Sequence, residues 1–195
     1  TTLFRSPGKV SALLRNESVS FLRRANCHRL GSLSAEDAAE GIRLTIEEAG
    51  RTIGPQAVAL AADESRGFPY LMQLVGYYSW AQHPDEPEVS LADVQAGSAL
   101  AHRGFTERVL EATYYDLSPK DLLFLRAMLV DAEESRLADI ASRLGEASNY
   151  TSTYKRRLIE QGVIGERGPS YVAIELPGFR AYLQDKLGPL EPASD

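Results

Sequence analysis

The sequence predicts a mainly α-helical protein in which a small helical bundle precedes a compact module of three helices and a β-hairpin. Two observations lead to this prediction. Up to Tyr115, capping residues and prolines separate stretches whose apolar residues recur at helical spacing. After Leu117, short helical stretches are followed by two β-prone stretches and one last helix. We therefore divide the chain into a lead-in at 1–17, the bundle at 18–116, the module at 117–188 and a tail at 189–195.

The bundle is expected to contain four helices joined by short loops, at 35–49, 55–64, 70–80 and 91–115. Ser34 caps the first helix ahead of two acidic residues, and Pro55 suits the first turn of the second. Ser90 caps the fourth. The third is apolar enough to be the buried helix of the bundle. Apolar side chains expected to point inward include Ile42, Val58, Leu60, Leu91, Val94 and Ala101.

The second module begins at Ser118 and Pro119, a capping residue followed by a proline in the first turn. Its apolar stripe is expected to comprise Leu122, Leu123, Leu125, Met128 and Leu129. Further helices are expected at 136–144, 148–161 and 178–187, and strands at 163–164 and 171–174. Gly162 closes the middle one of these helices in a left-handed conformation. This order of helices, turn and hairpin is that of a winged-helix form of helix-turn-helix.

Several functional classes are excluded by the residues present. The chain has 21 Lys+Arg and 27 Asp+Glu, a formal charge of −6, and one cysteine. No phosphate-binding G-x-x-x-x-G-K-[ST] loop, G-x-G-x-x-G or H-E-x-x-H motif occurs, and the three histidines lack ligand spacing. We therefore expect no catalysis, cofactor or metal in this chain by itself. No apolar run of about 18 residues exists, so we expect no membrane partner and a cytoplasmic location.

The helix at 148–161 is the candidate contact surface. Tyr150, Tyr154 and Leu158 share one face at helical spacing and are expected to point inward. The remaining polar and basic residues are those that contact phosphates and base edges in nucleic-acid readers. The candidate nucleic-acid-binding residues are Asn149, Ser152, Thr153, Lys155, Arg156, Arg157 and, at the hairpin tip, Arg167.

Charge argues against nucleic acid as the target. Residues 117–195 contain 10 Lys+Arg and 12 Asp+Glu, and 10 − 12 gives a net −2. Dedicated DNA-binding domains are usually basic, since phosphate neutralisation supplies much of their affinity. Double-stranded DNA and a protein partner therefore both remain open.

Three stretches, 21–25, 30–34 and 67–76, resemble the region after the last sheet strand of AAA+/STAND-type ATPases, including archaeal-type and origin-recognition-like members. The stretch 67–76 begins with the motif G-x-P-Y, at Gly67 to Tyr70. In that family the helix with this motif lies in a helical lid, and a winged-helix domain follows the lid. The resemblance implies a mainly α lid bundle and a winged-helix domain. It also implies an ATP-binding core before Thr1, so that ATP binds in a full-length parent ATPase and 1–17 leads in from this core.

The same resemblance implies nucleotide-facing residues in the lid. Tyr70 stands where many members of the family have a sensor arginine. Arg66, which directly precedes Gly67, could take the place of that arginine. The candidate cofactor-binding residues are Arg66, Gly67, Phe68, Pro69 and Tyr70. Arg23 and Arg24 lie near the junction of sheet and lid. They either contact nucleotide or a neighbouring subunit, or form ion pairs on the surface.

The implied function is that of a non-catalytic regulatory region whose winged helix is presented or hidden as nucleotide changes the lid. One alternative is a stand-alone winged-helix transcriptional regulator with an N-terminal dimerisation or sensor domain. Another is a structural oligomerisation module of a signalling ATPase. The sequence does not indicate the oligomeric state.

Overall fold

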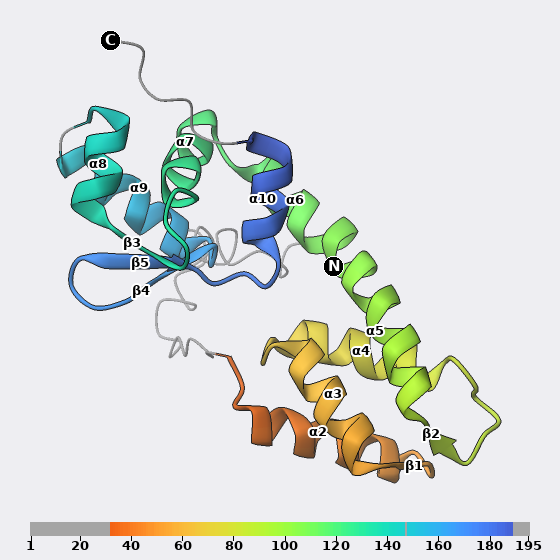
Figure 1. Ribbon diagram of the computed structural model, residues 1–195. Coiled ribbons are helices and arrows are strands. Elements are labelled where there is room, and N and C mark those ends of the chain that lie inside the picture. Colours follow the sequence, from red (N-terminus) through yellow and green to blue (C-terminus); the bar gives the residue numbers. More distant parts are fainter. Residues whose placement is uncertain (1–31, 147, 189–195) are drawn as a thin grey trace, which may run out of the picture. The chain divides into compact units, whose positions relative to one another are not determined.

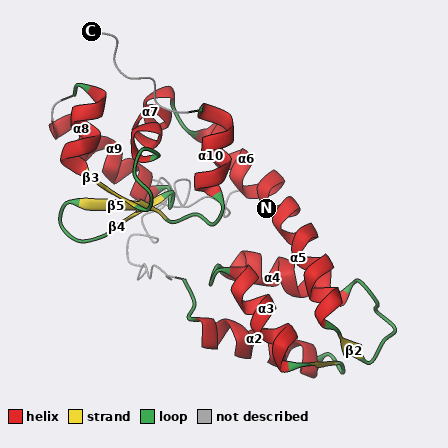
Figure 2. Cartoon of the chain, viewed as in Figure 1, coloured by secondary structure: helices red, strands yellow, loops and turns green. Residues whose placement is uncertain are grey.

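The computed structural model of the protein describes residues 32–146 and 148–188, which separate into two compact units at 32–113 and 114–188 (Figure 1). The boundary lies inside helix α6 (Glu111–Asp116). Most of the described residues are helical and the strands are short (Figure 2). The prediction of a mainly α-helical fold is therefore confirmed. The lead-in, the tail, Arg23 and Arg24 lie outside the described residues.

The first unit contains helices α2 (Ala35–Glu48), α3 (Pro55–Ser65), α4 (Pro69–Trp80) and α5 (Leu91–Phe105). Ser34 caps α2 by accepting a 3.0 Å hydrogen bond from the Asp37 N–H. Ser90 and Asp93 form a reciprocal capping box at the start of α5. The helix boundaries follow the sequence prediction closely because each start is encoded by a capping residue or a proline.

Close packing of α4 on α5 forms much of the core of this unit. Leu71 and Val75 of α4 and Val94, Ala101 and Phe105 of α5 are buried. The expected inward position of Leu91 is wrong, since 38% of it is exposed. It is the first residue of α5, ahead of the turns that pack against α4.

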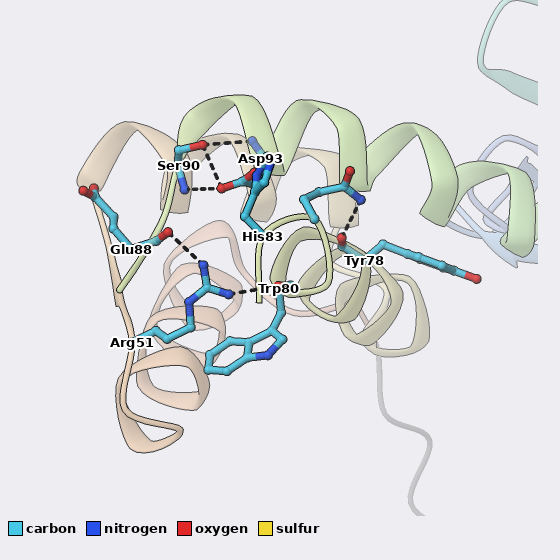
Figure 3. A network of polar contacts seen from close by, with 8 residues as sticks. Arg51, Tyr78, Trp80, His83, Glu88, Ser90 and Asp93 are labelled. Atoms are coloured by element: carbon cyan, nitrogen blue, oxygen red, sulfur yellow. Dashed lines mark hydrogen bonds and ion pairs between the residues drawn. The ribbon is translucent and has the colours of Figure 1, made fainter. Parts of the chain in front are cut away.

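The loop between α4 and α5 contains a strand that the sequence did not predict. Strand β1 (Thr52–Ile53) pairs in parallel with β2 (Glu88–Val89). Arg51, only 6% exposed, fastens this loop by donating hydrogen bonds of 2.9 Å to the Trp80 carbonyl and 2.8 Å to the Glu88 carbonyl (Figure 3). Its guanidinium also lies 4.6 Å from the centre of the Trp80 ring.

The loop is also held by His83, whose Nδ1 lies 2.6 Å from the Asp93 carboxylate (Figure 3). Burial raises the pKa of Asp93, but hydrogen bonds from Ser90 and His83 outweigh this effect, so its pKa lies below the ordinary value. Asp93 thus remains charged while it caps α5 and holds the loop.

Helix α5 continues into a π-helical stretch, η3 (Thr106–Leu110), and then into α6. The sequence predicts one helix over this range, and the backbone is indeed helical throughout. The wider π-helical turns have no distinct sequence pattern, so they were not expected.

The second unit contains α7 (Pro119–Met128), β3 (Glu134–Arg136), α8 (Leu137–Leu144), α9 (Ser148–Glu160), β4 (Ile164–Glu166), β5 (Tyr171–Ile174) and α10 (Phe179–Leu187). The three strands form an antiparallel sheet in the order β3-β5-β4. Ser135 pairs with Val172, and Gly165 pairs with Ala173. Strand β3 was not predicted. Gly162 has φ +73°, as expected for a left-handed helix end.

The core of this unit is formed where α7, α8 and α9 meet the sheet. Its largest fully buried side chains are Phe124, Leu125, Met128, Ile140, Leu158, Ile164, Phe179 and Leu183. The expected inward position of Leu123 is wrong, since 46% of it is exposed. Phe124 and Ala127 are buried on α7 instead, which rotates the apolar stripe by one residue.

Arg143 of α8 anchors the turn after α7. Its guanidinium binds both carboxylate oxygens of Asp131, at 2.6 and 2.7 Å, and the Ala127 carbonyl at 2.8 Å. The hydrogen bonds from Arg143 lower the pKa of Asp131 below its ordinary value, although burial opposes them. This turn leads directly into β3, so the ion pair helps to set the position of the sheet.

Candidate nucleic-acid interface

Helix α9 has one buried face and one exposed face. It contacts α7, α8 and β4, and in Figure 1 it lies beside α8 and the sheet. Thr151 and Leu158 are buried, at 3% and 0% exposure, whereas Ser152, Thr153 and Arg156 are exposed.

The structure describes part of the α9 face that the tyrosine spacing predicts to point inward. Tyr154 is half-buried and Leu158 is fully buried, as expected. The side chains of Asn149 and Tyr150 lie outside the described residues. Thr151 is buried although the sequence analysis did not expect it inside.

Arg157 lies at the edge of the exposed face and forms an ion pair with a buried carboxylate. Its Nη2 atom is 3.2 Å from Oδ2 of Asp121, whose side chain is fully buried. The same Asp121 oxygen accepts hydrogen bonds from the Ser118 N–H at 2.8 Å and the Ser118 hydroxyl at 2.7 Å. Arg157 therefore joins α9 to the capping box that starts α7.

Lys155 turns from α9 toward the hairpin. Its Nζ atom lies 2.6 Å from Oε1 of Glu166 in β4, and its side chain is only 17% exposed. The hydrogen bond and charge of Lys155 lower the pKa of Glu166 below its ordinary value. Glu166 is therefore charged at neutral pH.

Arg167, at the tip of the β4–β5 hairpin, also lies among carboxylates. Its Nη1 atom is 2.7 Å from Oε1 of Glu175, and its Nε atom is 4.0 Å from Oε1 of Glu134. Glu175 lies directly against Gly165, and a side chain at that position would occupy the space of its carboxylate.

The structure thus divides the predicted basic residues into two groups. Lys155, Arg157 and Arg167 are each paired with a carboxylate of the same unit. Within the described part of the chain, Arg156 forms no ion pair and is exposed. Acidic residues therefore offset most of the local positive charge, which the sequence pattern around 155–157 did not reveal.

The acidic partners are the residues that sequence reasoning missed. Asp121 was recognisable only as part of a helix start, and Glu166 and Glu175 only as hairpin residues. Asp121 and Glu166 meet α9 through its packing on α7 and β4, and Glu175 meets Arg167 through the antiparallel pairing of β4 with β5. No local sequence pattern reports such a contact.

The predicted nucleotide-facing residues lie at the turn between α3 and α4 in the other unit. Arg66 is exposed and has φ +48°, a left-handed conformation that is uncommon for a residue other than glycine. Gly67 is buried, has φ +66°, and its carbonyl accepts a 2.8 Å hydrogen bond from the Leu33 N–H. A side chain at Gly67 would overlap the Leu33 carbonyl.

The aromatic residues of this turn pack on α5. The Phe68 ring centre is 5.6 Å from that of Phe105, and the Tyr70 ring centre is 6.2 Å from it. Pro69 is exposed at the first position of α4. Hydrogen bonding with the Tyr70 side chain raises the pKa of Arg108 of η3. Arg66 is thus an exposed cation of the turn, whereas Phe68 and Tyr70 contact Phe105 of α5.

No cluster of three or more potential metal ligands occurs within residues 32–146 and 148–188. Across the same residues, every helix is too short or too polar to cross a lipid bilayer.

Comparisons with known proteins find a family model and similar solved structures. Residues 107–183 match a family model described as "Domain of unknown function (DUF8462)", which is less than half of the chain. A RuvB mutant of Thermotoga maritima is a similar solved structure, with 15% sequence identity and a TM-score of 0.38. The alignment covers 87% of this chain and 54% of that one, so this chain spans about half the length of the RuvB structure. No curated protein matches the sequence.

Proposed function

We propose that residues 114–188 are a winged-helix module that binds double-stranded DNA through the exposed face of α9. The observation that carries this proposal is the position of α9. It follows α7, β3 and α8, precedes the β4–β5 hairpin, and exposes Ser152, Thr153 and Arg156. A helix in this position of a helix-turn-helix is the one that enters the major groove.

The chemistry of the exposed face supports this role. Hydroxyl groups of serine and threonine donate to and accept from both phosphates and base edges. The guanidinium of Arg156 suits phosphate oxygens or the O6 and N7 acceptors of guanine. Because Arg156 is the one candidate cation without an acidic partner among the residues that the structure describes, we expect the affinity to be weak and only moderately dependent on salt.

We further propose that the chain is the non-catalytic C-terminal region of an AAA+/STAND-type ATPase, with residues 32–113 as its lid. The support is the resemblance of residues 67–76 to the lid helix of that family. ATP would bind in the parent protein, and Arg66 would lie toward it from the turn before α4. A nucleotide-dependent movement of the lid would then control access to the winged-helix module.

A protein partner is the second candidate target. It is favoured by the pairing of Lys155, Arg157 and Arg167 with carboxylates. It is also favoured by the charge of residues 114–188, where 10 Lys+Arg and 11 Asp+Glu give 10 − 11 = −1. Under this alternative the face of α9 docks onto a protein surface and not onto a phosphate backbone.

Fluorescence anisotropy of a labelled random-sequence duplex tests the DNA proposal with the chain as it is. We expect binding at about 50 mM salt and an affinity roughly threefold to fourfold lower at about 200 mM, as the single phosphate contact of Arg156 would give. Absence of binding at the lower concentration would leave the protein partner as the better proposal.

A further inference from the structure

We infer that Glu166 and Glu175 compete with nucleic-acid phosphates for Lys155 and Arg167, and so hold the DNA affinity of this module below what its cations allow. This inference rests on the proposed function. It assigns a role to two glutamates that lie beside the candidate interface and are not themselves expected to contact DNA.

The first pair joins α9 to the hairpin. Lys155 Nζ is 2.6 Å from Glu166 Oε1, yet Glu166 is 60% exposed. A phosphate approaching from solvent therefore meets the carboxylate before the ammonium group. Because the Glu166 carboxylate faces solvent, it can turn away from Lys155 while the unit stays folded.

The second pair lies at the tip of the hairpin. Arg167 Nη1 is 2.7 Å from Glu175 Oε1, and the two side chains are 41% and 47% exposed. Glu175 is held in place because Gly165 leaves room for its carboxylate on β4. The arginine that would reach DNA from the hairpin tip is therefore occupied by an anion built into the same sheet.

The first pair joins α9 to β4, and the second pair begins one residue further along the hairpin, so we expect their opening to extend one surface. Lys155 lies next to Arg156 in the helix, and Glu166 is adjacent in sequence to Arg167. With both cations released from these glutamates, the surface would carry Lys155, Arg156 and Arg167 in place of Arg156 alone, while Glu134 would still lie 4.0 Å from Nε of Arg167. Each cation that reaches a phosphate adds about 0.9 to the steepness of the plot of log affinity against log salt.

The test measures duplex binding by anisotropy across a salt series for E166Q, E175Q and the double variant. Glutamine keeps the size of glutamate and one accepting oxygen but removes its charge. We expect each single variant to bind roughly threefold to tenfold more tightly at low salt, and the double variant to have a salt slope steeper by about 1.8. D185N removes an exposed acid from α10, changes the net charge equally and is the matched control.

A second comparison separates release of a cation from a change in net charge. On an R167Q background E175Q should give no gain, and on a K155Q background E166Q should give none. Thermal denaturation of each variant checks that the unit remains folded. If E175Q disturbs the hairpin, the comparison of E166Q in the wild-type and K155Q backgrounds still tests whether release of a cation raises the affinity.

The possible results have distinct meanings. Gains that need Lys155 and Arg167 support the inference. Gains no larger than that of D185N, with the wild-type protein binding duplex, overturn the inference but keep the proposed function. No duplex binding by any variant overturns both.

Discussion

At the residue scale, Gly97 shows how one position sets the packing of two helices. A Cβ atom at this position would overlap the backbone of Ser79 and lie 2.6 Å from its Cα. Residue 97 must therefore lack a side chain if α5 is to approach α4 this closely. The sequence shows a glycine inside a helical pattern there, but it does not show what the glycine touches.

We expect G97A to destabilise the protein by about 1–3 kcal/mol, because the helices would have to separate. G76A is the matched control, since nothing lies within 4 Å of a Cβ atom there. That change should be neutral or stabilise α4 by about 0.5–1 kcal/mol. Chemical denaturation of both variants checks the difference; equal effects would refute the close approach.

A second residue-scale distinction separates two adjacent arginines of α9. R157Q should lower stability by about 1 kcal/mol, since it leaves the buried Asp121 without its ion-pair partner. R156Q should change stability by less than about 0.5 kcal/mol, because Arg156 is exposed. Thermal denaturation measures both. A larger loss for R156Q would contradict the assignment of these two side chains.

At the scale of elements, the helices that begin after a capping serine were predictable from the sequence. Ser34, Ser90 and Ser118 precede α2, α5 and α7, and each accepts a hydrogen bond from a backbone N–H of the first turn. Strands β1, β2 and β3 were missed, since two or three residues are too few for an alternating pattern. Their pairing partners lie far away in sequence.

The Asp131–Arg143 ion pair gives an element-scale prediction for the turn between α7 and β3. We expect D131N to cost about 1–2 kcal/mol at neutral pH, because Arg143 loses a bidentate charged acceptor. Since the folded-state pKa of Asp131 is lowered, its contribution is present above the unfolded pKa of about 3.9. It is lost as the pH falls further, through the folded pKa.

Urea denaturation of wild-type protein and D131N between about pH 7 and pH 3 checks this sign. The stability difference should be constant down to about pH 4 and then shrink. D185N, which removes an exposed acid from α10, should not show the same pattern. A difference that grows as the pH falls would contradict the role given to Arg143.

At the scale of the whole molecule, the order of helices and hairpin was accessible from the sequence, whereas the electrostatic character of the candidate interface was not. The cluster Lys155, Arg156 and Arg157 looks like a basic patch in one dimension. In the fold two of its three cations face carboxylates brought in by α7 and β4. Tertiary pairing therefore decides how many cations are available to a polyanion.

The most direct measurement of the central claim is the salt dependence of duplex binding for the wild-type protein and R156Q. The matched control is K186Q, which removes an exposed cation from α10. If the exposed face of α9 contacts DNA, R156Q lowers affinity and reduces the salt slope by about 0.9, while K186Q leaves the slope unchanged. Equal slopes for all three proteins would contradict the claim that α9 is the nucleic-acid interface.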